Sequence, residues 1–207
     1  MRNERINGSL AASISIERLE KYLADQDHNL DAALRLYEWN MSLSEAFYTP
    51  LQCLEVCLRN KIHARMCDVY GDWLTDQTAA PLNDFSRRMI NEAISNVDGN
   101  VTPGSIVAEA KFGFWVGLLA PQYDASIWRR ALSQRFQVGQ KRSRRQVHGR
   151  FNAIRRFRNR VAHHEPIFHR PVAQLHDEII DAIGWMCADT QAWAAHHSRV
   201  PDLLNSN

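Results

Sequence analysis

The stretch of the chain that is richest in reactive groups is residues 155–167, RRFRNRVAHHEPI. It holds four arginines, one asparagine, two histidines and one glutamate. Within it, Arg158, Asn159 and His163 follow the spacing Arg-Asn-x-x-x-His. A guanidinium presents several N–H donors in a planar array that fits phosphate, and an imidazole gives or takes a proton near neutral pH. Together these groups could break a phosphodiester without a metal ion.

The spacing around Arg158 predicts a helix that ends shortly after His163. At about 100° per residue, Arg158 falls within an apolar stripe made by Val147, Phe151, Ile154 and Val161. A charge on such a face needs a partner or a polar groove. Pro166 disfavours helical backbone at Glu165, so the helix should end near residues 163–165.

Residues 158–166, RNRVAHHEP, resemble the signature of the HEPN superfamily in the form seen in its Abi-like (abortive infection) branch. Earlier segments resemble the same branch: Trp39-Asn40, Phe47-Tyr48, LEVCLRN at 54–60 and KFGFWVGLL at 111–119. The resemblance covers about residues 30–170. It implies an all-α fold, a HEPN-like helical bundle with additional helices. It also implies an RNase active site at the Arg-Asn-x-x-x-His segment, with two such segments meeting at a homodimer interface.

This resemblance implies roles for Arg158, Asn159 and His163 in the attack of an RNA 2′-OH on the neighbouring phosphorus. His163 would act as general base or general acid, and Arg158 would hold the non-bridging oxygens as charge builds on them. Asn159 would orient His163 or the phosphate. The product would carry a cyclic phosphate, and DNA, which lacks the 2′-OH, should resist cleavage. His164 is the reserve candidate, either aiding His163 or capping the end of the helix.

Glu55 and Arg59 lie four residues apart on a predicted helix, and Asn60 follows them. One interpretation is an internal ion pair that fixes the core, because buried charges must pair. The other is that Glu55, Arg59 or Asn60 supports Arg158. The sequence leaves both interpretations open.

The segment from residue 129 to residue 160 carries 12 of the 25 Lys and Arg residues and neither Asp nor Glu, although the net charge of the chain is only +2. A segment of one sign makes a local positive field. It is either a solvated basic face or a surface for a polyanion. Under the second interpretation, an RNA backbone would bind in a salt-sensitive manner. The residues expected to guide it are Lys141, Arg142, Arg144, Arg145, Arg155, Arg156 and Arg160.

Apolar residues recur at helical spacing along the chain, and no stretch shows the sustained apolar–polar alternation of a strand. The first helix should be capped by Ser13 or Ser15. The later helices are expected at 30–47, 50–70, 84–97, 105–119, 128–136, 141–165 and 171–197, with a boundary at Thr49-Pro50. At 207 residues, we expect a single domain over 1–207. Residues 1–13 and 198–207 are expected to be loosely ordered.

Several classes of protein are excluded by motifs that the sequence lacks. It has no P-loop, no G-x-G-x-x-G and no H-E-x-x-H pattern. Its four cysteines, Cys53, Cys57, Cys67 and Cys187, form no C-x-x-C pair, which favours free thiols over a zinc site. We therefore expect neither a metal nor a cofactor. With no signal peptide and no apolar run of about 18 residues, we expect a cytoplasmic protein without a membrane partner.

Similarity to the Abi-like branch implies a phage-defence or toxin–antitoxin component that arrests growth. RNA is then the expected substrate, a second copy of the chain the expected partner, and an antitoxin, protein or RNA, a further candidate partner. An alternative function keeps the fold and omits catalysis. It is a non-catalytic HEPN module that binds RNA or protein, since one fold hosts active and inactive members.

Overall fold

The computed structural model describes residues 3–206, and within that range it is helical with no strand. The predicted all-α class is therefore confirmed. In chain order the elements are α1 (Glu4–Ile14), α2 (Ile16–Asp25), α3 (Leu30–Tyr70), α4 (Asp84–Ser95), α5 (Pro103–Glu109), α6 (Phe112–Gly117), the 3₁₀-helix η1 (Pro121–Tyr123), the π-helix η2 (Asp124–Leu132), the 3₁₀-helix η3 (Ser133–Phe136), α7 (Arg144–Ala162), α8 (Val172–Gly184), α9 (Ala188–His197) and α10 (Val200–Asn205).

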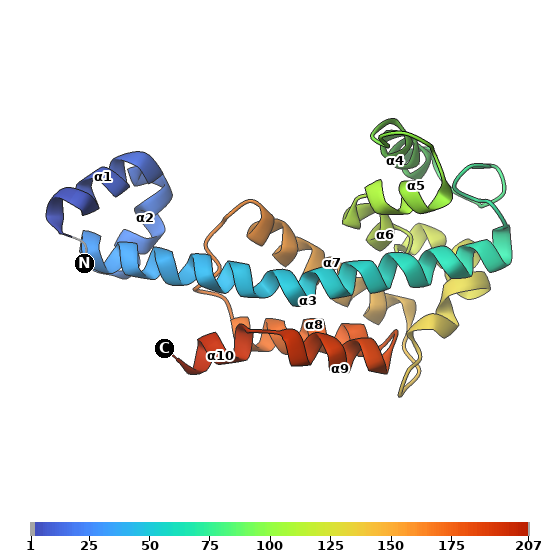
Figure 1. Cartoon of the computed structure of the whole chain (residues 1–207). Coiled ribbons are helices and arrows are strands. Elements are labelled where there is room, and N and C mark those ends of the chain that lie inside the picture. Colours follow the sequence, from blue (N-terminus) through green and yellow to red (C-terminus); the bar gives the residue numbers. More distant parts are fainter. Residues whose placement is uncertain (1–2, 207) are drawn as a thin grey trace.

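The fold is built around α3, which is 41 residues long and therefore about 60 Å from end to end. Figure 1 shows α1 and α2 beside its start, α8 to α10 along one side, and α4 to α6 near its far end. Its apolar stripe is buried, as predicted, at Leu51, Leu54, Leu58, Ile62 and Met66. Cys53 and Cys57 on the other side are buried too, so other elements cover α3 on more than one face.

The predicted helix boundary at Thr49-Pro50 is wrong, because Pro50 lies inside the continuous helix α3 and is buried. A proline in a helix interior removes one backbone donor and costs about 3 kcal/mol. The neighbouring Phe47, Leu51 and Leu54 are each no more than 6% exposed. Burying each such side chain stabilises the fold by about 1.5–3 kcal/mol, so packing outweighs the cost of the proline.

The predicted helix over 105–119 is also wrong, because the chain is extended at Ala110, where φ is −65° and ψ is 121°. The break separates α5 from α6, and the buried indole of Trp115 donates to the Ala110 carbonyl at 3.2 Å. The helix expected at 128–136 begins earlier than predicted, as η2, and continues as η3.

The last predicted helix, 171–197, is two helices that fold back on each other. The chain leaves α8 at Gly184 and is extended at Cys187 before α9 begins. A Cβ atom on Gly184 would lie 2.4 Å from the side chain of Gln191. Glycine therefore allows α9 to pack closely against the end of α8.

Both ends of the chain, where loose order was expected, contain helices in the described range. Asn3 caps α1 through its side chain, which accepts from the Ile6 amide at 3.0 Å. At the other end, Val200 of α10 is fully buried. Residues 1, 2 and 207 lie outside the described residues.

A smaller core cluster joins α1, α2 and the start of α3, and it reaches the loop that follows α7. Its buried members are Ala11, Leu19, Tyr22, Ala33 and Leu34. Phe168 packs against this cluster, with its ring centroid 5.1 Å from that of Tyr22. Ser15, one of the two predicted caps, begins α2. The N-terminal helices therefore brace the segment directly after the predicted active-site residues.

Candidate functional site

The helix that carries Arg158 is fixed at its start by a capping box. Ser143 accepts from the Gln146 amide at 3.3 Å, and the Gln146 side chain accepts from the Ser143 amide at 2.9 Å. The helix α7 then buries Val147, Phe151, Ile154, Phe157 and Val161. Phe157 thus occupies the core, and Arg158 lies at the edge of the apolar stripe, with 40% of its side chain exposed.

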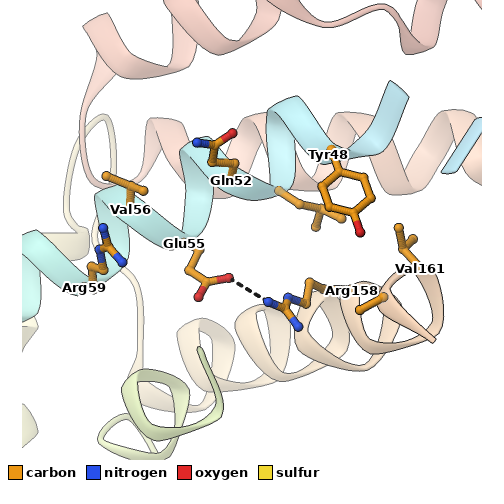
Figure 2. Close-up of a pocket in the computed structure, with 9 residues that line it drawn as sticks. Tyr48, Gln52, Glu55, Val56, Arg59, Arg158 and Val161 are labelled. Carbon is orange, nitrogen blue, oxygen red and sulfur yellow. Dashed lines mark ion pairs between the residues drawn. The ribbon is translucent and has the colours of Figure 1, made fainter. Parts of the chain in front are cut away.

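Arg158 opens onto a pocket of about 320 Å³ between α3 and α7. Figure 2 shows Glu55 of α3 directed toward the guanidinium of Arg158. The Nη2–Oε2 distance is 3.6 Å, longer than the 2.7–2.9 Å of a strong charge-assisted hydrogen bond. The pocket is lined by Tyr48, Leu51, Gln52, Glu55, Val56, Arg59, Arg158, Val161 and Ala162. The prediction that Arg158 needs a partner or a polar groove is confirmed, and its guanidinium is only loosely held.

Two of the three predicted supporting residues converge on this pocket. Burial raises the pKa of Glu55, and the nearby Arg158 and Arg59 oppose that rise. Arg59 lines the pocket and donates to the Ala108 carbonyl at 3.5 Å. Asn60 lines a different pocket, between α3 and α9. Glu55 of α3 thus forms its ion pair with Arg158 of α7. Asn60 lies away from this pair, at the pocket between α3 and α9.

The C-terminal turn of α7 ends in a double hydrogen bond. The His164 amide donates to the Val161 carbonyl at 3.0 Å, and the Glu165 amide donates to the Arg160 carbonyl at 2.8 Å. This is the Schellman arrangement, whose left-handed residue is usually glycine. Here that residue is His164, with φ at 55°. The helix ends at Ala162 with His163 as its cap, which confirms the predicted end near residues 163–165.

Two side chains far away in the sequence hold this turn. The Arg18 guanidinium of α2 donates to the His163 carbonyl at 3.2 Å and to the His164 carbonyl at 2.6 Å. Asn40 of α3 is 3% exposed, and its side-chain oxygen accepts from the amides of Ile167 and Phe168 at 2.8 and 3.2 Å. Sequence reasoning assigned a role to neither. Two signals were available for Asn40: it belongs to the Trp39-Asn40 segment that resembles the Abi-like branch, and an amide in the apolar pattern of a helix must be hydrogen-bonded when it is buried.

The two histidines lie in different surroundings. His164 lines a second pocket, of about 240 Å³, together with Tyr37, Asn40, Met41, Ser44, Glu45, Tyr48 and Val161. Because Tyr48 and Val161 line both pockets, the two are adjacent. His163 is exposed and Asn159 is half-buried, and neither is among the residues that line these two pockets. Within one chain, the structure brings Arg158, Glu55 and Arg59 together, with His164 next to them.

Two of the predicted RNA-binding arginines are bound to other parts of the chain. Arg142 donates to the carbonyls of Phe136, Val138 and Gln140, at 3.2, 2.9 and 3.0 Å. Its guanidinium also lies 4.6 Å from the ring centroid of Trp185. Arg144, with only 16% of its side chain exposed, lies 3.3 Å from Asp124 and donates to the Leu119 carbonyl at 3.1 Å.

The remaining basic residues of that set divide into two groups. Arg155 donates to the Asn152 side chain at 3.1 Å, and Arg160 lies 2.9 Å from the Glu165 carboxylate. By contrast, Lys141, Arg145 and Arg156 are exposed. The guanidinium and ammonium groups available to a polyanion are therefore fewer than the sequence suggests.

The four cysteines are free thiols, with Cys53 and Cys57 buried and Cys67 and Cys187 half-buried. Burial raises the pKa of Cys57 to about 11. Among residues 3–206, no three His, Cys, Asp or Glu side chains are grouped so as to hold a metal ion. In the same range, every helix is too short or too polar to cross a membrane.

Comparison with protein-family models gives one match, to the Abi-like protein family, over residues 10–169. The match begins before residue 30, where the resemblance of the motifs begins, so it takes in α2 and Arg18. No curated protein and no solved structure matches the chain. The chain belongs to the Abi-like protein family, a membership that suggests a role in abortive infection.

Proposed function

We propose that the protein is a metal-independent endoribonuclease of the HEPN type. It would act as a growth-arrest effector in phage defence, either in abortive infection or as the toxin of a toxin–antitoxin pair. One observation carries the proposal. Arg158 is partly exposed in a pocket and loosely paired with Glu55, and it lies on the helix that ends in His163 and His164.

In the proposed reaction, the 2′-oxygen of a ribose attacks the adjacent phosphorus, forming the O2′–P bond and breaking the P–O5′ bond. A base takes the proton of the 2′-OH, and an acid gives a proton to the leaving O5′. The products are a 2′,3′-cyclic phosphate and a 5′-hydroxyl. Arg158 neutralises the charge that builds on the non-bridging oxygens, and Asn159 orients His163 or the phosphate.

The reaction needs two proton transfers, and we assign one of them to His163 of each chain in a homodimer. A two-fold axis places identical groups on the two sides of one site, so a second Arg158 and His163 would complete it. His164, which lines the pocket next to Arg158, is the second candidate for proton transfer. The exposed Lys141, Arg145 and Arg156 would attract the RNA backbone, which makes binding weaker at high salt.

The experiment that tests this proposal is incubation of labelled single-stranded RNA with the purified chain in EDTA. Wild type should cleave RNA and leave a cyclic phosphate, whereas His163→Ala should not. His196→Ala is the matched control, because His196 is exposed at the end of α9. His164→Ala shows which imidazole transfers the proton. Equal cleavage by wild type and by both histidine variants would overturn the assignment.

A second candidate function, a non-catalytic module that binds RNA or protein, is favoured by one observation. Asn159 and His163 lie outside the pocket that contains Arg158, so the three groups do not converge within a single chain. Such a module would bind RNA, or a partner such as an antitoxin, without cleaving RNA. Induced expression separates the two candidates, since a toxic RNase slows growth and Arg158→Ala should restore it.

A further inference from the structure

Tyr48 is an exposed aromatic residue of α3 that takes no part in the proposed proton transfers or in phosphate binding. Tyr48 is 56% exposed, whereas its neighbour Phe47 is fully buried. In Figure 2 the Tyr48 side chain extends from α3 toward the side of the groove formed by Arg158 and Val161 of α7. The ring of Tyr48 therefore exposes a large apolar face to water, although it lies in the middle of a long core helix.

Tyr48 stands between two cavities. It lines both the pocket of Arg158, of about 320 Å³, and the pocket of His164, of about 240 Å³. Val161 also lines both pockets, and the two adjacent pockets together form the groove considered for a ligand. The guanidinium of Arg158 and the imidazole of His164 therefore belong to adjacent pockets that share Tyr48.

The charges around Tyr48 point to the kind of molecule that fits the groove. The pocket of Arg158 also contains Arg59, and one carboxylate, Glu55, opposes these two cations. A phosphodiester is an anion that a loosely paired guanidinium can bind. Aromatic side chains beside such cations are the means by which proteins bind single-stranded RNA, because every base has a face that stacks.

We propose that Tyr48 is the base-stacking residue of an RNA site in this groove. A base of single-stranded RNA lies on the Tyr48 ring, and a phosphate of the same strand lies against Arg158. Duplex RNA keeps its bases stacked inside the helix and cannot use the ring, so Tyr48 gives the protein its preference for single strands. This inference rests on the proposed function for the class of substrate, but it concerns binding, and binding can be measured without cleavage.

The test measures binding of fluorescein-labelled 2′-O-methyl RNA by fluorescence anisotropy, because that RNA cannot be cleaved by its own 2′-oxygen. Tyr48→Ala should weaken binding of the single strand roughly 5- to 150-fold, the range that a lost stacked base represents. Tyr48→Trp keeps a stacking face and should bind close to wild type. Phe85→Ala is the matched control, because Phe85 is 61% exposed on α4, and it should change nothing.

An abasic series identifies the stacked base. One nucleotide at a time is replaced by an abasic unit, and one replacement should weaken wild type to the level of Tyr48→Ala. That same replacement should cost Tyr48→Ala nothing further. Binding of duplex RNA should be the same for wild type and for Tyr48→Ala.

Three results would overturn the inference: no binding of single strands by wild type, unchanged binding by Tyr48→Ala, or an equal loss with Phe85→Ala. A fourth would be a change of Tyr48→Ala from dimer to monomer in light scattering, which would make Tyr48 a contact between copies of the chain. The proposed catalysis is judged separately. If the protein cleaves ordinary RNA but Tyr48→Ala binds RNA as wild type does, only the stacking role is excluded. If binding depends on Tyr48 but no RNA is cleaved, only the nuclease activity is excluded.

Discussion

The two ends of α7 carry the same type of residue under opposite conditions. At the N-terminal end, Arg142 and Arg144 contact backbone carbonyls, Asp124 and Trp185. At the C-terminal end, Arg158 has a single ion-pair distance of 3.6 Å to Glu55 and opens onto a pocket. Within one basic run, Arg142 and Arg144 are thus structural, whereas Arg158 is available to a ligand.

The helix dipole contributes to the difference between Arg144 and Arg158. A positive charge beside a helix N-terminus is unfavourable, because the unpaired amides there already carry positive partial charge. Arg144 is the first residue of α7, and its contacts with Asp124 and the Leu119 carbonyl offset that cost. Near the C-terminus the dipole favours cations, so Arg158 needs less compensation from the protein. A count of basic residues therefore overestimates the free positive surface.

Removal of the Arg158 side chain tests this difference between the arginines most directly. We predict that Arg158→Ala lowers RNA cleavage about 100-fold or more, the typical cost of losing a group that stabilises charge in a transition state. Its melting temperature should stay near that of wild type, because the side chain is 40% exposed and weakly paired. Gel-based cleavage rates and thermal unfolding on the same preparations measure both effects. A large loss of stability would place Arg158 with the structural arginines.

The matching change at the other end is Arg142→Ala. We predict a loss of roughly 2 kcal/mol in the free energy of unfolding, because hydrogen bonds from a charged donor to three carbonyls disappear. Cleavage per folded molecule should be unchanged. Urea unfolding measures the stability, and Arg145→Ala, at an exposed neighbouring position, should stay within about 0.5 kcal/mol of wild type. If Arg142→Ala instead reduced RNA affinity without destabilising the chain, the two ends would not differ in the way described.

Local patterns predicted part of this site. Apolar spacing identified the buried stripe of α3, and Pro166 marked the end of α7 near His163. Both signals act over a few residues and depend only on helix geometry and backbone sterics. The need of Arg158 for a partner followed from the same spacing, and Glu55 supplies it.

Such local patterns could not predict contacts between residues that are far apart in the sequence. Arg18 reaches the His163 carbonyl from 145 residues away, and nothing in its own neighbourhood indicates that contact. The partners of Arg142 and Arg144 became evident only in the folded chain, so all seven basic residues looked alike in the sequence. The continuity of α3 through Pro50 has the same origin, because tertiary packing overrides a local penalty.

A substitution in the turn at the end of α7 should have a smaller effect than Arg142→Ala, and it should raise stability instead of lowering it. We predict that His164→Gly stabilises the chain by about 1 kcal/mol, because a non-glycine residue at positive φ is strained and φ here is 55°. Removing the ring from the pocket shared with Tyr48 should at the same time lower cleavage if His164 transfers a proton. Thermal unfolding checks the first effect. His163→Gly is the control and should not stabilise, because φ of His163 is −92°.

The smallest expected effect is a change in pH dependence at Glu55, which faces Arg158. Burial raises the pKa of Glu55 above its ordinary value of 4.5. Above that pH the folded chain holds this proton more tightly than the unfolded chain does, so the contribution of Glu55 to stability falls as pH rises to the folded-state pKa. Glu55→Gln cannot ionise, so we predict a flatter dependence of melting temperature on pH just above 4.5.

Arg158→Ala should have the opposite effect on the pH dependence of stability, because the guanidinium of Arg158 opposes the rise of the Glu55 pKa. Without it the pKa rises further, and stability continues to fall to higher pH than in wild type. Thermal unfolding at a series of pH values measures all three chains, with Glu20→Gln as an exposed control. Curves of the same shape for wild type, Glu55→Gln and Arg158→Ala would mean that Glu55 and Arg158 are not electrostatically coupled. In that case Glu55 would not partly neutralise Arg158, and the contrast between Arg158 and the arginines at the start of α7 would lose its basis.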